Sequence, residues 1–138
     1  MSYPRLEIDL NKIHHNTRML VEQCKKTGVE IAAVTKGFCG NPKIAQAVAD
    51  AGVTSLADSR IQNLKKMAQI PIPKLLLRIP MITEIDELIE YVDISINSEV
   101  EIIKLISTAA LRKDKTHRII LMVDLGDLRE GFLEEQII

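Results

Sequence analysis

The sequence predicts an α/β fold in which parallel strands alternate with helices, and three observations support this prediction. Short apolar runs suited to strands recur along the whole chain. Amphipathic helical patterns fill the intervals between these runs. No visible sequence repeat or low-complexity linker interrupts the alternation. Because parallel neighbours need a crossover connection, this alternation predicts parallel strands joined by right-handed crossovers.

Six strands are predicted, each from an apolar run bounded by turn or cap signals. They cover residues 5–10, 30–35, 54–57, 74–78, 93–96 and 118–123. The last run reads Arg-Ile-Ile-Leu-Met-Val and has the clearest strand pattern. A helical pattern resumes after it, near Phe132.

The helices between the strands are predicted from capping residues and from apolar residues that share a face. Asn11 is the predicted cap of the first helix, and Gly28 ends that helix. Asn41 and Pro42 supply a cap and a first-turn proline for the second helix. Three later helix starts are predicted from two capping boxes and one threonine: Ser59 with Gln62, Ser98 with Glu101, and Thr83.

Two architectures fit six alternating units: a doubly wound open sheet, and part of a (β/α)8 barrel. A complete barrel takes about 250 residues, or at least about 200, whereas this chain has 138. We therefore expect residues 1–138 to form an incomplete (β/α)8 TIM-barrel type fold with about six β/α units. An unclosed barrel exposes strand edges and apolar helix faces. We accordingly expect the chain to associate with a copy of itself or to be extended by further sequence.

The composition fits a globular domain and gives no support to several other classes of protein. Hydrophobic residues make up 46% of the chain, and the formal net charge is -1. This balance offers no argument for a nucleic-acid partner or an anionic membrane. The start lacks the apolar core of a signal peptide, and no stretch is long and apolar enough to span a bilayer. Cys24 and Cys39 show no metal or redox spacing, so we expect a cytoplasmic protein without a metal site.

Polar residues follow the predicted strands at their carboxyl ends, which is where parallel α/β folds bind ligands. If the strands are parallel, these residues lie along one rim of the sheet. The candidates are Asn11, Lys36, Asp58-Ser59-Arg60, Arg78, Asn97-Ser98, and the segment 124–131, which begins with Asp124 and contains Arg129.

Lys36 is the candidate with the most definite chemical implication. It follows the apolar run 31–34 and is expected at the end of a buried strand. Burying a lysine is costly unless the amine has a partner or a task. A buried amine can be kept neutral and nucleophilic, as an aldehyde cofactor requires. The alternative is a lysine whose aliphatic stem lies on apolar surface while its amine reaches solvent.

The other rim residues also have purely structural interpretations. Asp58 and Asn97, like the serines that follow them, can cap helices. Arg78 can pair with a carboxylate at the rim. Asp124 can bond the backbone of a turn that Gly126 makes necessary.

Three segments together resemble one family, the alanine racemases. Residues 5–16 (Arg-Leu-Glu-Ile-Asp-Leu-Asn-Lys-Ile-His-His-Asn) are similar to the family's opening strand and helix. Residues 33–37 (Ala-Val-Thr-Lys-Gly) resemble the strand that carries its cofactor lysine. Residues 124–131 (Asp-Leu-Gly-Asp-Leu-Arg-Glu-Gly) resemble its Asp-Thr-Gly-Met-x-Arg-x-Gly loop. The order and spacing of the three segments agree with those of the family. Their sequences are closest to the ornithine-racemase-like branch of the family.

The resemblance implies a fold-type III pyridoxal-phosphate amino-acid racemase that acts on a free amino acid, ornithine or alanine. Lys36 would hold the cofactor as a Schiff base and would be the catalytic base or acid on one face of the substrate α-carbon. Arg129 would contact the cofactor's phenolic oxygen. Together with Arg78, Asn97 and Asp124, these two residues form the expected cofactor-binding set. The family resemblance also implies a homodimer.

The sequence departs from alanine racemases directly after the lysine. Residues 37–40 read Gly-Phe-Cys-Gly, one residue shorter than the family's Ala-Asn-Ala-Tyr-Gly and without its tyrosine. By the resemblance, the phosphate-binding loops and an opposite-face tyrosine on a C-terminal β domain come later and are absent from these residues. We therefore expect the isolated 138-residue chain to lack a complete site and to be inactive.

Two other functions stay open at this point. Small single-domain proteins of the same fold bind pyridoxal phosphate and buffer its supply without clear catalysis, and residues 58–63 (Asp-Ser-Arg-Ile-Gln-Asn) are similar to their third-strand loop. A lyase of the same fold, such as a decarboxylase or a D-threonine aldolase, is the other alternative.

Overall fold

The computed structural model describes residue 4 and residues 6–133. Its centre is a sheet of five strands in the order β1-β2-β3-β4-β5. The strands are β1 (Ala32–Val34), β2 (Ser55–Asp58), β3 (Lys74–Leu76), β4 (Ile94–Asn97) and β5 (Arg118–Leu121). Every neighbouring pair is parallel, so the predicted parallel pairing is confirmed.

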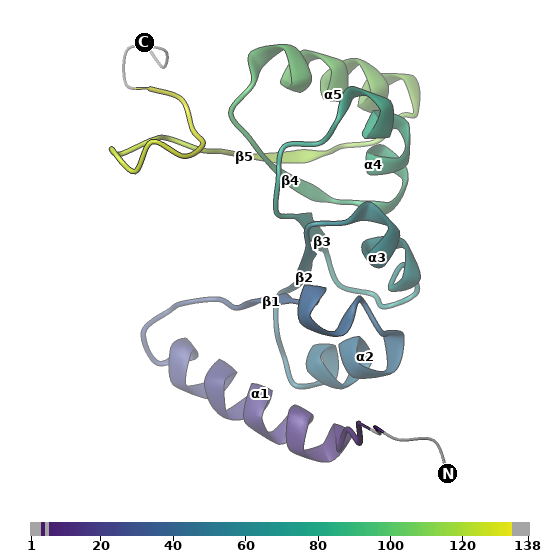
Figure 1. Ribbon diagram of the computed structural model, residues 1–138, viewed down its shortest axis with the longest axis vertical. Coiled ribbons are helices and arrows are strands. Elements are labelled where there is room, and N and C mark those ends of the chain that lie inside the picture. The colour runs from purple at the N-terminus through teal and green to yellow at the C-terminus, as the bar shows by residue number, and fades with distance from the viewer. Residues whose placement is uncertain (1–3, 5, 134–138) are drawn as a thin grey trace.

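Helices cover one face of this sheet. The α-helices are α1 (Leu10–Lys25), α2 (Pro42–Asp50), α3 (Ile61–Lys66), α4 (Ile85–Tyr91) and α5 (Val100–Arg112), and the 3-10 helices are η1 (Lys36–Phe38) and η2 (Ile82–Glu84). Figure 1 shows α2 to α5 on the same side of the strands, while α1 packs against α2. Among the residues described, no helix is long and apolar enough to cross a membrane.

The strand order distinguishes the two architectures that fit the sequence. The five strands pair in chain order without a reversal. A doubly wound sheet reverses its strand order at a switch point, whereas the strands of a (β/α)8 barrel pair in succession. The fold is therefore an incomplete (β/α)8-type barrel, and β1 and β5 are the edge strands of the part that the structure describes.

The hydrophobic core lies between the sheet and helices α2 to α5. Its fully buried members include Leu56, Leu64, Leu76, Leu88 and Ile106. Apolar side chains elsewhere on the strands are open: Val34 on β1 is 48% exposed and Ile120 on β5 is 47% exposed. These exposed side chains agree with the expectation that an unclosed barrel leaves apolar surface uncovered.

The predicted first strand is wrong within the described residues. Residues 6–9 form no strand, and α1 begins at Leu10. The cap of α1 is Asp9 rather than Asn11, because the Asp9 carboxylate accepts hydrogen bonds from the N–H groups of Asn11 (3.0 Å) and Lys12 (3.2 Å). Asn11 lies in the first turn, and position 5 of the predicted strand is outside the described residues.

Both predicted capping boxes are also wrong. Helix α3 follows the cap residue Arg60 and α5 follows the cap residue Glu99, and neither cap makes a side-chain hydrogen bond. Each helix thus begins one residue later than the preceding serine predicts. By contrast, Asn41 caps α2 as predicted, because its side chain accepts from the N–H groups at positions 43 and 44.

The segment after β5 forms a closed loop that ends at Phe132, and most of the helical pattern expected from near Phe132 onward lies outside the described residues. Val123 and Phe132 form an isolated parallel bridge. The Phe132 N–H donates to the Met122 carbonyl (2.8 Å), and the Asp124 N–H donates to the Phe132 carbonyl (2.9 Å). Gly131, with a φ of 145°, passes so close to the Asp124 backbone that a Cβ would clash with it. The loop 124–131 is therefore held at both ends beside β5.

Candidate active site

The parallel register brings the carboxyl ends of the strands to one edge of the sheet. Asp58 and Asn97 are the last residues of β2 and β4, and Lys36, Arg78 and Asp124 follow β1, β3 and β5. These predicted rim residues therefore share an edge, but they do not all face the same way. Asn11, the candidate expected after the first strand, lies instead in the first turn of α1.

Asp58 and Asn97 are turned toward the helix layer. Paired residues on neighbouring parallel strands point to the same face. Asp58 pairs with Leu76, and Leu76 pairs with Ser95, two residues before Asn97. Leu76 belongs to the core beneath the helices. Asp58 and Asn97, both 0% exposed, are accordingly enclosed between the sheet and the helices.

Lys36 lies in the turn after β1, and its amine is free. The residue begins the 3-10 helix η1 and is exposed. Within the described part of the chain, its side chain makes no hydrogen bond or ion pair. The prediction that Lys36 ends a buried strand is wrong, because β1 is an edge strand with Ala32 and Val34 exposed. The case for Lys36 as a functional amine rests instead on its availability.

Thr35 anchors the turn that carries Lys36. Its N–H donates to the Ala57 carbonyl (2.8 Å), and its hydroxyl donates to Oδ2 of Asp58 (2.7 Å). Asp58 also accepts from Nδ2 of Asn63 (3.1 Å). Sequence reasoning missed Thr35 and Asn63, because Thr35 and Asp58 are 23 positions apart and no local pattern relates them.

Arg78 is held by a carboxylate, as its structural interpretation predicted. Its Nη1 and Nη2 donate to the two carboxylate oxygens of Glu84, both at 2.7 Å, and its Nε donates to the Ser59 carbonyl (2.7 Å). The hydrogen bonds from Arg78 hold the pKa of Glu84 below its ordinary value. The Arg78 guanidinium therefore has most of its donors in use beside the rim.

Asn97 is one end of a buried chain of polar groups along β4. Its Nδ2 donates to Oγ of Ser95 (2.9 Å), and Ser95 Oγ lies 2.8 Å from Nε2 of His117. Nδ1 of His117 is 3.1 Å from the Val92 carbonyl and must donate to it, because a carbonyl can only accept. Burial lowers the pKa of His117. Oδ1 of Asn97 is buried without a hydrogen-bond partner in the described structure.

Asp124 shapes the loop that presents Arg129. Its Oδ1 accepts from the N–H groups of Gly126 (2.8 Å) and Leu128 (3.2 Å), and the Gly126 bond is the leading cause of its lowered pKa. Gly126 has a φ of 111°, as a tight turn here requires. Arg129 is exposed, and its Nη2 lies 3.8 Å from a carboxylate oxygen of Glu130. The turn interpretation of Asp124 is thus confirmed, and Arg129 projects from that turn.

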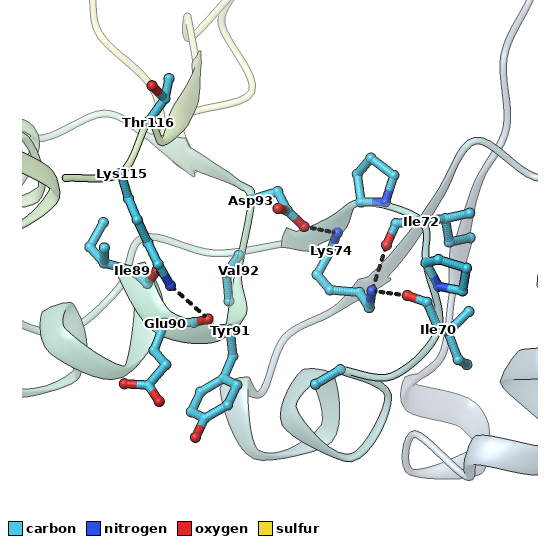
Figure 2. Close-up of a pocket in the computed structure, with 13 residues that line it drawn as sticks. Ile70, Ile72, Lys74, Ile89, Glu90, Tyr91, Val92, Asp93, Lys115 and Thr116 are labelled. Carbon is cyan, nitrogen blue, oxygen red and sulfur yellow. Dashed lines mark hydrogen bonds between the residues drawn. The ribbon is translucent and has the colours of Figure 1, made fainter. Parts of the chain in front are cut away.

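A cavity of about 550 Å³ lies at the opposite, amino-terminal edge of the sheet (Figure 2). Lys74 in its wall is only 5% exposed, and its amine donates to the carbonyls of Ile70 (2.6 Å) and Ile72 (2.5 Å). Burial lowers the pKa of Lys74, and the Asp93 carboxylate opposes this effect. Sequence reasoning placed Lys74 in a strand but did not single out its amine.

The fold is thus part of a parallel α/β barrel that carries an exposed lysine, Lys36, at the carboxyl ends of its strands. A family model described as "Alanine racemase, N-terminal domain" matches residues 8–138. The chain belongs to this family, which confirms the resemblance found in its sequence motifs.

Two curated relatives are amino-acid racemases by name. An ornithine racemase of Acetoanaerobium sticklandii is 44% identical over 134 residues, which is 97% of this chain and 38% of that protein. A lysine racemase of Thermotoga maritima is 37% identical over 140 residues, which is 100% of this chain and 40% of that protein. The chain therefore spans about two fifths of the length of these relatives.

A solved structure supports the fold independently. The crystal structure of D-threonine aldolase from Filomicrobium marinum has a TM-score of 0.81 to this chain, with 18% sequence identity, and the match covers 94% of this chain and 37% of that one. At this level of identity the similarity concerns the fold alone.

Proposed function

We propose that this chain is the cofactor-lysine part of a pyridoxal-phosphate-dependent amino-acid racemase. The observation that carries the proposal is the free, exposed amine of Lys36 at the carboxyl edge of the sheet, in a chain 44% identical to an ornithine racemase. Carboxyl ends of barrel strands are where such folds place catalytic groups. The site fits an aldehyde cofactor, because it offers for covalent attachment a primary amine that has no hydrogen-bond partner among the described residues.

Lys36 is the residue that would hold the cofactor and move the proton. When bound, pyridoxal phosphate would supply an electron sink for the negative charge left on the substrate α-carbon. The Nζ of Lys36 would then take or return the α-proton on one face. Racemisation also needs a proton donor on the other face, and we assign that group to residues outside the 138 residues of this chain.

The remaining rim residues would support this site in different ways. Arg129 is exposed on a loop beside β5, which suits a cation that binds the cofactor's phenolic oxygen. Asp124 would contribute by holding the conformation of the loop 124–131 that carries Arg129, through its hydrogen bonds to the backbone of that loop. Arg78 stays a proposed cofactor-binding residue through the one guanidinium N–H that Glu84, Ser59 and Ile79 leave unused. Asn97 belongs to the same expected set, but it is 0% exposed and faces the helix layer, so it would support the site from behind the rim without touching the cofactor.

We propose a free amino acid with a cationic side chain as the substrate. The names of the two curated relatives, ornithine racemase and lysine racemase, favour such a substrate over alanine. A cytoplasmic homodimer is proposed for the complete protein from the family resemblance. The similarity to D-threonine aldolase is one of fold, so it does not favour a lyase.

The test is a chiral product assay of the complete gene product with pyridoxal phosphate. Incubation with L-ornithine, L-lysine or L-alanine, one at a time, is expected to form the D-enantiomer from a basic amino acid. Lys36→Ala is expected to abolish this conversion, whereas Lys43→Ala, at another exposed lysine, is expected to retain it. Cleavage products, or no conversion of any of the three, would contradict the proposal.

A further inference from the structure

We propose that Asp58 and Thr35 are positioning residues that hold the Lys36 turn in the conformation in which its amine reacts with an aldehyde cofactor. This inference rests on the proposed function of Lys36. Neither residue would touch the cofactor, because both are 0% exposed and Asp58 faces the helix layer.

The first anchor of the turn is its junction with β2. Thr35 donates its N–H to the Ala57 carbonyl at 2.8 Å, which continues the ladder between β1 and β2 by one residue. The Thr35 hydroxyl donates to Oδ2 of Asp58 at 2.7 Å. A hydrogen bond to a carboxylate is stronger than one between neutral groups. The residue directly before Lys36 is therefore fixed through both its backbone and its side chain.

The Asp58 carboxylate is itself held on several sides. Besides Thr35, it accepts from the Arg60 N–H at 2.9 Å and from Nδ2 of Asn63 at 3.1 Å. No lysine or arginine pairs with it among the residues that the structure describes. A buried carboxylate without a cation needs such donors to offset its lost hydration. Removing the Thr35 hydroxyl would therefore disturb the carboxylate and the turn together.

The second anchor is at the far end of the same turn. Gly40, with a φ of 63°, packs so closely on α3 that a Cβ would lie 2.8 Å from Cβ of Asn63. The Gly40 N–H donates back to the Thr35 carbonyl at 3.2 Å, and Nζ of Lys66 donates to the Cys39 carbonyl at 3.1 Å. The turn 35–40 is thus fastened to β2 and α3 at both ends.

Lys36 lies between these two anchors, with its backbone held and its side chain free. This arrangement fixes the position of the Cα atom and the direction in which the amine can reach. Covalent attachment depends steeply on such placement, since a misplacement of about 1 Å can cost roughly 100-fold in rate. Asp58 and Thr35 would accordingly affect the reactivity of one lysine and leave the other exposed lysines unchanged.

The test measures the rate at which pyridoxal phosphate attaches to Lys36 in the complete gene product, trapped by borohydride and mapped by peptide mass spectrometry. Exposed Lys43 in the same sample is the internal standard. Thr35→Val and Asp58→Asn are expected to slow labelling of Lys36 by roughly 10- to 100-fold relative to Lys43. Thr35→Ser keeps the hydroxyl and is expected to restore the original rate, which a purely steric role for Thr35 would not predict.

The outcomes separate this inference from the proposed function. If the unaltered protein is not labelled at Lys36, the proposed function fails. If it is labelled and folded Thr35→Val reacts at the original rate, the positioning role is wrong. If the variants at the buried residues do not fold, Lys66→Met provides a second test. It changes an exposed side chain and removes the hydrogen bond from Lys66 to the Cys39 carbonyl of the same turn. That variant is expected to slow labelling less than Thr35→Val, and an unchanged rate would overturn the proposal.

Discussion

Two lysines at opposite edges of the sheet, Lys36 and Lys74, differ in almost every physical respect. Lys36 follows β1 at the carboxyl edge and is exposed, and its amine has no hydrogen-bond partner in the part of the chain that the structure describes. Lys74 begins β3 at the amino edge, is 5% exposed and bonds the carbonyls of Ile70 and Ile72. The buried lysine, Lys74, thus uses its amine in hydrogen bonds within the fold. The exposed lysine, Lys36, has its amine available to react.

The comparison also shows why Lys74 needs its burial. The segment 70–73 contains two prolines, which lack an N–H group, so its carbonyls have few backbone donors nearby. The Lys74 amine donates to the Ile72 carbonyl and adds a second bond to the Ile70 carbonyl, which also accepts from the Ile72 N–H at 2.9 Å (Figure 2). The Lys36 amine should therefore contribute to reactivity, and the Lys74 amine should contribute to stability.

The largest stability effect is expected at Gly40, where the Lys36 turn meets α3. Gly40→Ala adds a Cβ at 2.8 Å from Asn63 and places alanine at a φ of 63°. Together these are expected to lower the free energy of unfolding by about 2–4 kcal/mol. Chemical denaturation measures this, with Gly37→Ala as the matched control, because nothing lies within 4 Å of a Cβ there. Equal losses in both variants would show that the turn is not tightly packed.

A smaller loss is expected when Lys74 is replaced. Lys74→Met keeps much of the side-chain volume but removes the amine that bonds the Ile72 carbonyl and one of the two donors to the Ile70 carbonyl. The free energy of unfolding is therefore expected to fall by about 1–3 kcal/mol. Lys115→Met also removes an amine that donates to a carbonyl, that of Ile89 at 3.2 Å, but Lys115 is exposed and water can replace its bond, so stability is expected to change by less than about 0.5 kcal/mol. If Lys74→Met reduces cofactor attachment while leaving stability unchanged, the structural role assigned to Lys74 is wrong.

The smallest effect is a pH dependence at the amino edge, through His117. Burial lowers its pKa below the ordinary value of 6.5, opposed by the Val92 carbonyl and the Asp93 carboxylate. The unfolded chain therefore binds more protons than the folded one just below pH 6.5, and stability falls as the pH drops through that window. One such group changes stability by at most about 1.4 kcal/mol per pH unit. His117→Gln should flatten this part of a stability-versus-pH curve, and an unaltered slope would mean that His117 does not cause it.

Local patterns in the sequence predicted the elements better than their boundaries. Asn41 before Pro42 is a cap without a close competitor, and α2 begins there as predicted. Asp9 and Asn11 are both acceptable caps two residues apart, and the sequence alone does not choose between them. The motifs of the family located Lys36 and the loop that begins at Asp124.

The site itself depends on contacts that are distant in sequence. The bond between Thr35 and Asp58 joins positions 23 apart, and no periodicity or motif relates them. Lys74 is buried because the segment 70–73 folds over it. The apolar residues of the strand that follows Lys74 do not predict this burial. Lys36 is exposed in the turn after β1, and only the strand order shows that β1 is an edge strand of the part that the structure describes.

The most direct test of this account is to identify which lysine of the complete gene product pyridoxal phosphate modifies. The protein is incubated with the cofactor, reduced with borohydride and mapped by mass spectrometry. We expect the adduct at Lys36 and none at Lys74, because the first amine is free and the second is enclosed. An adduct at Lys74, or at any lysine in preference to Lys36, would contradict the account.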